Sequence, residues 1–308
     1  MTELALPQRP ALGLMVRCAL TLVAFALLWH LANGADIAKA LAQASPFWLA
    51  ASVAMLVLQT VLSAQRWRVT AAQLGQSFSM NHAVREYFIS QLFNQALPGA
   101  VLGDAARAVR AREQGGLLVA GQAVFFERLA GQIAMFLALS VAFLSTLAVA
   151  GGLDWPPALS SGLLTFVFSV TVLLAGLLSL STARQGTFAN AQRWLEPLTR
   201  ALISRSVLPK QLSLGAAILL CNLLAFGFAA RAVGVELSFV EVTALVPVVL
   251  FAMLIPFTVS GWGVREGAAA LVLPIAGVSV SNSVAASIMF GVAILIAVAP
   301  GALLALKK

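Results

Sequence analysis

Long apolar runs are the feature that most constrains how this chain folds. Several runs approach or exceed the roughly 20 residues that a helix needs to cross ~30 Å of hydrocarbon. A content of 61% hydrophobic and 10% charged residues, with a mean hydropathy of +0.96, lies outside the range of soluble domains. We therefore expect an all-α, polytopic integral membrane protein. The clearest runs are 14–32, 47–63, 117–150, 159–180, 212–230 and 285–306.

The basic residues indicate how these runs are oriented. The net charge of +8 comes from basic residues that gather on one side of the predicted spans, and this distribution argues against nucleic acid as a partner. If the amino terminus is cytoplasmic, Lys39 and Arg231 fall outside, Arg128 lies inside a span, and the other basic residues collect on the inner side. This distribution predicts that both termini are cytoplasmic. The inner set is Arg9, Arg17, Arg66, Arg68, Arg85, Arg107, Arg110, Arg112, Arg184, Arg193, Arg200, Arg205, Lys210, Arg265, Lys307 and Lys308.

Two further apolar regions, 81–116 and 238–280, are interrupted. Each contains a proline, then a glycine five residues later, then an arginine four residues after that. Proline and glycine stop helices, so each region is expected to break in its middle. Pro247 is also expected to interrupt the second region. The residues assigned to the two breaks are Pro98, Gly99, Gly103, Pro256, Gly261 and Gly263.

The arms of both regions are too short to cross a membrane comfortably. The first is predicted to be a re-entrant hairpin that enters from the cytoplasm, and the second a hairpin that enters from outside. A competing interpretation makes the second region two short spans, with Arg265 at the cytoplasmic surface beside Trp262. The fold is thus about six full spans plus two hairpins in inverted orientation, or alternatively eight spans. Inverted hairpins are typical of transporters.

Carboxylates and arginines coincide with the breaks. Asp104 lies three residues from Arg107, and Glu266 adjoins Arg265. Broken helices at membrane depth expose backbone donors and acceptors, so these four residues are candidate ligand contacts. The alternative is that each carboxylate merely neutralises its arginine and allows the hairpin to fold.

Glu127 and Arg128 lie about ten positions into an apolar segment, which corresponds to roughly 15 Å of helix. Ionisable residues near the centre of a bilayer are costly and are usually functional. If the span instead starts deeper, both residues lie near the inner interface. Gly131, one turn beyond Glu127, would allow a neighbouring helix to approach closely.

The chain is expected to form a single membrane domain, 1–308, with halves 1–150 and 151–308. Segment 182–210 is predicted to hold an amphipathic helix on the cytoplasmic surface, either as a connector or as a lipid-binding element. Cys18 and Cys221 both lie in predicted spans, so no disulfide is expected. Metal-ligand clusters, a Walker A loop and a Gly-x-Ser-x-Gly elbow are missing from the sequence, so neither an enzyme nor a cofactor or metal is predicted.

Three motifs in order carry a resemblance to a known family. They are NQALPGAVLGDAAR at 94–107, FERLAG at 126–131 and IPFTVSGWGVREG at 255–267. Together they resemble the lysylphosphatidylglycerol synthase transmembrane family, which is flippase-like and includes YbhN-like stand-alone members. The family's charged positions correspond here to Asp104, Arg107, Glu127, Arg128, Arg265 and Glu266.

The resemblance implies a multi-pass protein of the bacterial inner membrane that moves a lipid between leaflets. The implied substrate is a phospholipid, an aminoacylated lipid, a hopanoid or a polyprenyl-linked lipid, and a homo-oligomer or a partner enzyme is compatible with it. No soluble aminoacyl-transferase domain is expected after the last span. Two other hypotheses stay open: a non-transporting membrane partner of an envelope enzyme, and an intramembrane enzyme that acts on lipid phosphates.

Overall fold

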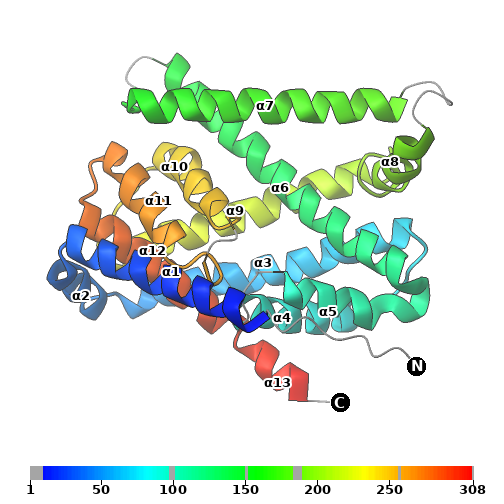
Figure 1. Ribbon diagram of the computed structural model, residues 1–308, viewed down its shortest axis with the longest axis horizontal. Helices are drawn as coiled ribbons and strands as arrows, with labels where there is room; N and C mark the ends of the chain where they lie inside the picture. The colour runs from blue at the N-terminus through cyan, green and yellow to red at the C-terminus, as the bar shows by residue number, and fades with distance from the viewer. Residues whose placement is uncertain (1–9, 97–100, 150–151, 183–188, 256–257, 307–308) are drawn as a thin grey trace.

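The computed structural model describes residues 10–96, 101–149, 152–182, 189–255 and 258–306. These residues form a bundle of helices without strands (Figure 1). The long helices are α1 (Pro10–Leu31), α3 (Pro46–Gln73), α6 (Gly116–Ala148), α7 (Pro157–Thr182), α9 (Leu208–Ala232) and α12 (Val280–Val298). The shorter ones are α2 (Gly34–Ala42), α4 (Met80–Ala96), α5 (Leu102–Arg110), α8 (Ala189–Leu202), α10 (Phe239–Ala252), α11 (Val264–Val272) and α13 (Pro300–Leu306). The predicted all-α class is confirmed.

Within the described residues, five helices are long and apolar enough to cross a membrane, and a bent pair raises this number to six. The bent pair is α1 and α2, which meet at 95°. Asn33 lies between them in the left-handed conformation, with φ of 49°, which asparagine tolerates better than most residues. The polytopic membrane protein predicted from the apolar runs is therefore confirmed, although the first run bends sharply at its end.

Local sequence signals explain several helix starts. Pro46 opens α3, a position where its missing N–H costs nothing. Ser238 and Glu241 form a capping box at the start of α10. Pro247 does not end α10, contrary to the sequence interpretation, but lies buried inside it. Packing by neighbouring helices makes proline tolerable in such a helix.

The core lies where α3 and α9 pack along each other. Ala225, Ala229 and Ala230 on α9 are fully buried, and their small side chains let the helices approach closely. Because the two helices are close, the Ser52 hydroxyl on α3 donates a 2.7 Å hydrogen bond to the backbone oxygen of Ala225 on α9.

Two helix pairs flank this core. The pair α4 and α5 packs on α3 and α6, and the pair α10 and α11 packs on α6, α9 and α12. The two pairs lie on opposite sides of α3 and α9 (Figure 1). The apolar face of α8 packs inward through Leu198 and Leu202, which join Phe126 in a small cluster. This helix lies within the segment 182–210, whose predicted place on the cytoplasmic surface stays a prediction.

Candidate functional site

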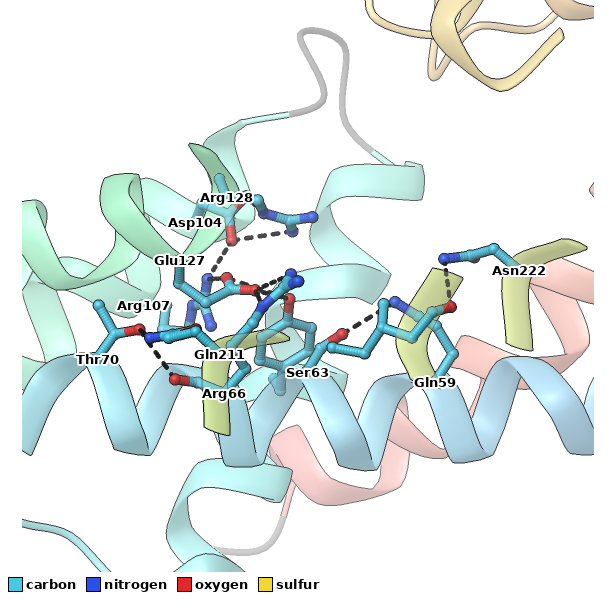
Figure 2. A network of polar contacts seen from close by, with 12 residues as sticks. Gln59, Ser63, Arg66, Thr70, Asp104, Arg107, Glu127, Arg128, Gln211 and Asn222 are labelled. Carbon is cyan, nitrogen blue, oxygen red and sulfur yellow. Dashed lines mark hydrogen bonds and ion pairs between the residues drawn. The ribbon is translucent and has the colours of Figure 1, made fainter. Parts of the chain in front are cut away.

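A buried network of five charged residues links three helices (Figure 2). Arg66 comes from α3, Asp104 and Arg107 from α5, and Glu127 and Arg128 from α6. Four of the five were expected as site residues from the sequence. The structure brings these four together and adds Arg66.

Glu127 is completely buried and accepts bonds from two arginines. Arg66 donates through Nη2 at 2.7 Å and through Nε at 3.2 Å, both to Oε1. Arg107 Nη2 lies 3.5 Å from Oε2, and the Tyr87 hydroxyl donates to Oε1 at 3.2 Å. A carboxylate in such a site is stable only when it is paired in this way.

Asp104 joins both arms of the first helix pair to α6. Arg107 donates to its Oδ1 at 2.8 Å, and Arg128 donates to both carboxylate oxygens at 2.9 and 3.1 Å. Ser90 and Asn94 on α4 complete its bonding, at 3.0 and 3.1 Å. The carboxylate therefore joins α4, α5 and α6.

Two glycines make this network possible. A Cβ at Gly103 would lie 2.0 Å from the backbone oxygen of Ser90, so only glycine lets α5 approach α4 this closely. A Cβ at Gly131 would lie 2.9 Å from Nη2 of Arg66. The sequence suggested that a neighbouring helix approaches Gly131, and the group that occupies this space is the Arg66 guanidinium. Gly103 lies within the first turn of α5 rather than in the break itself.

Arg265 and Glu266 form a separate, compact pair. Arg265 donates to Glu266 Oε1 from Nη2 at 2.5 Å and to the Ser287 hydroxyl from Nε at 3.1 Å. Glu266 also caps α11 by accepting the Gly263 N–H at 2.6 Å. Trp262 lies over the guanidinium, 4.7 Å from ring centroid to Cζ. Arg265 is 1% exposed, so it is enclosed together with Trp262 rather than open to the surface.

The two helix pairs meet at their tips. The Ser260 hydroxyl, just before α11, lies 2.9 Å from the backbone oxygens of Asn94 and Gln95 at the end of α4. Gly261 and Gly263 have φ of 76° and 88°, as expected for residues that break a helix. Three of the predicted break residues, Pro98, Gly99 and Pro256, lie outside the described residues.

A cavity of about 280 Å³ lies at this junction of the tips. Its lining combines polar side chains with apolar ones. The polar lining is Gln59, Thr60, Gln91, Asn94, Gln95, Arg128, Gln132, Asn222 and Ser260, and the apolar lining is Leu56, Met135, Leu250, Met253, Leu254, Phe290, Ile294, Ala297 and Val298. Its volume is close to the lower end of the range for small-molecule sites. Arg265 and Glu266 are not among the lining residues, but Phe290 lies beneath the Arg265 guanidinium.

A smaller cavity of about 110 Å³ adjoins the first and shares part of its lining. Arg66, Ser63 and Tyr87 line it, together with residues that line both cavities. The shared residues are Gln59, Arg128, Gln132, Met135 and Asn222.

Sequence reasoning missed Arg66 and Tyr87 as site residues. Arg66 was counted among the cytoplasmic charges because it follows an apolar run and is close to Arg68, yet it is 4% exposed. Arg107 and Arg265, counted in the same set, are also buried. Trp67 and Tyr87 sandwich Arg107, with ring centroids 4.6 and 4.4 Å from its Cζ. No sequence signal marked these aromatic residues, because their partner is distant along the chain.

Comparison with known proteins identifies one family. A family model described as the lysylphosphatidylglycerol synthase TM region matches residues 14–301. No curated protein and no solved structure matches the chain. The match covers nearly the whole chain and includes every residue of the charged network. The chain therefore belongs to the family of the lysylphosphatidylglycerol synthase transmembrane region.

Proposed function

We propose that this protein moves a lipid, or a lipid-linked group, between the two leaflets of the bacterial inner membrane. The observation that carries the proposal is the cavity between the tips of the two helix pairs. Its lining offers polar groups to a head group and apolar side chains to an acyl chain. A polar cavity at membrane depth lowers the cost of taking a head group across hydrocarbon.

The arrangement of the helix pairs supports the proposal. In Figure 1 they lie on opposite sides of α3 and α9, and Ser260 ties their tips together. This is the geometry expected if both pairs are re-entrant hairpins that enter from opposite faces. A cavity between two such hairpins lies near the midplane, where transporters of inverted topology bind their substrates.

Loop contacts support the expected sidedness with cytoplasmic termini. At one end of the bundle, the Ser45 N–H donates to the Ala232 oxygen at 2.8 Å, close to Lys39 and Arg231 in sequence. At the other end, Arg85 donates to the Leu304 oxygen and Gln76 to the Ala111 oxygen, at 3.2 and 3.1 Å. Most of the basic loop residues belong to this second end, which the positive-inside rule assigns to the cytoplasm.

Reconstitution into liposomes tests the proposal. Fluorescent phospholipids in the inner leaflet should become accessible to an impermeant quencher faster with the protein than without it. Gln132→Met and Asn222→Leu remove polar wall groups while keeping their size, so we expect transport to slow at least about tenfold. Gln73→Met, at the end of α3, is the matched control and should transport normally.

Equal rates with and without protein, for phospholipids, aminoacylated lipids and polyprenyl phosphates alike, would contradict transport. That outcome would favour the non-transporting membrane partner. The partner hypothesis relies on the cytoplasmic helix and expects neutral replacement of Glu127 and Arg265 to be tolerated. The proposal assigns no enzymatic reaction to the chain.

A further inference from the structure

The charged network carries an excess of positive charge. Arg66, Arg107 and Arg128 share two carboxylates, Asp104 and Glu127, which leaves one positive charge uncompensated. The pair of Arg265 and Glu266 is neutral by comparison. An unbalanced charge in a buried site is costly unless a ligand of opposite sign neutralises it.

Two of the three arginines of this network reach the cavity wall. Among the described residues that line the two cavities, the charged side chains are Arg66 and Arg128. Glu127 and Asp104 are not lining residues and accept bonds from these arginines. A bound ligand would therefore meet guanidinium groups, while the carboxylates hold the guanidinium groups from the other side.

Arg66 also keeps an unused donor. Its Nε and Nη2 atoms bond Glu127, but Nη1 has no hydrogen-bond partner among the described residues although the side chain is 5% exposed. A buried donor without an acceptor costs free energy that a ligand oxygen would recover. Gly131 leaves room for the guanidinium at this wall, since a Cβ there would lie 2.9 Å from Nη2.

Neutral donors surround the two arginines. The side-chain amides of Gln59, Gln132 and Asn222 line both cavities, and Ser63 lines the smaller one. Amide and hydroxyl groups can bond phosphoryl oxygens and the hydroxyl groups of a head group. None of these neutral groups offers a counter-charge to an ammonium ion.

We infer that Arg66 and Arg128 form a subsite for the phosphodiester of a lipid head group that carries one net negative charge. The inference rests on the proposed function, since it names the head group that the cavity takes. A phosphodiester balances the single excess charge and accepts bonds from both guanidinium groups. A head group with an added ammonium is zwitterionic or cationic and finds no carboxylate on the wall, so it binds more weakly.

The test measures binding to the purified full chain in detergent with three dioctanoyl lipids. Their head groups are phosphoglycerol, phosphoethanolamine and lysyl-phosphoglycerol. We expect the dissociation constant for phosphoglycerol to be about tenfold lower than for the other two, because one charge-assisted contact contributes roughly that factor. Equal affinities, or a preference for either amine-bearing head group, would overturn the inference.

Substitutions of Arg128 test whether this residue causes the preference for phosphoglycerol. Arg128→Gln should bring the three dissociation constants within about threefold of one another, whereas Arg128→Lys, which keeps the charge, should retain the order. Arg200→Gln, which removes an exposed pair with Glu196 on α8, is the matched control and should leave the preference unchanged. Arg128 has a half-exposed side chain, so its replacement is compatible with folding. A full preference in Arg128→Gln would contradict the subsite.

Competition identifies the source of the phosphodiester. Glycerophosphoglycerol, which lacks acyl chains, should bind at least about tenfold more weakly than the lipid because the apolar lining stays unfilled. If glycerophosphoglycerol binds as tightly as the lipid, the site still takes a phosphodiester, but its ligand is not a lipid. If inorganic phosphate displaces the bound lipid more strongly than glycerophosphoglycerol does, the phosphodiester subsite is overturned. The inference and the proposed function fail separately: selective binding without liposome transport contradicts the function, and transport indifferent to head-group charge contradicts the inference.

Discussion

The arginines of the network are stabilised in different ways. Arg66 and Arg128 bond carboxylates through two nitrogen atoms each. Within the described part of the chain, Arg107 donates through Nη2 alone, and its buried Nε and Nη1 have no hydrogen-bond partner. Its guanidinium is instead enclosed between the rings of Trp67 and Tyr87. Stacking of a flat cation on aromatic faces offsets part of the missing hydrogen bonding.

Arg107→Lys should therefore destabilise the protein although it keeps the charge. A lysine ammonium cannot stack as a plane between two rings, so we expect a loss of about 1–3 kcal/mol. The measurement is the shift of the unfolding transition in detergent. Arg110→Lys, on the same helix and paired with Glu86 at a half-exposed site, should lose less than about 1 kcal/mol. Equal shifts for the two variants would contradict the role of stacking.

At the scale of elements, the sequence predicted which segments form helices better than it predicted how those helices bend and pack. Apolar runs and the positions of Pro98 and Pro256 were sufficient to predict spans and interrupted regions, because these signals are local. The partners of Glu127 were not predictable, since Arg66 is 61 residues away and reaches it only after α3 and α6 pack. The bend after α1 and the continuous α10 also depend on packing that no local pattern records.

The packing of α11 on α12 depends on a glycine in the facing helix. A Cβ at Gly291 would lie 2.3 Å from Nη2 of Arg265 and 2.5 Å from the Trp262 ring. Gly291→Ala should displace both side chains and destabilise the second helix pair by about 1–3 kcal/mol.

Gly267→Ala on α11 is the matched control. Nothing lies within 4 Å of a Cβ at this position, so alanine should stabilise the helix by up to about 1 kcal/mol. Thermal unfolding of the two variants in the same detergent should thus shift in opposite directions. A stabilised Gly291→Ala protein would show that α11 and α12 are less closely packed than this contact requires.

At the scale of the whole molecule, the two halves of the chain have the same order of helices. A long helix, a broken pair and another long helix follow one another as α3, α4 with α5, and α6, and again as α9, α10 with α11, and α12. If the halves are inverted, both ends of the first pair face the cytoplasm and both ends of the second pair face outward. The proposed transport path depends on this opposition, so it is the property of the whole chain that most needs a direct test.

Single cysteines at exposed positions in loops or near helix ends provide that test, in a background where Cys18 and Cys221 are replaced by alanine. An impermeant thiol reagent applied to cells with a permeable outer membrane should label Glu236→Cys and Val280→Cys, which flank the second pair. Asn81→Cys and Glu113→Cys, which flank the first pair, should be labelled only after the inner membrane is opened. Asp154→Cys, between α6 and α7, serves as an outward-facing reference. If all four of these flanking cysteines are labelled from the same side of the membrane, the two halves are not inverted. The opposed hairpins on which the proposed transport path depends would then be excluded as well.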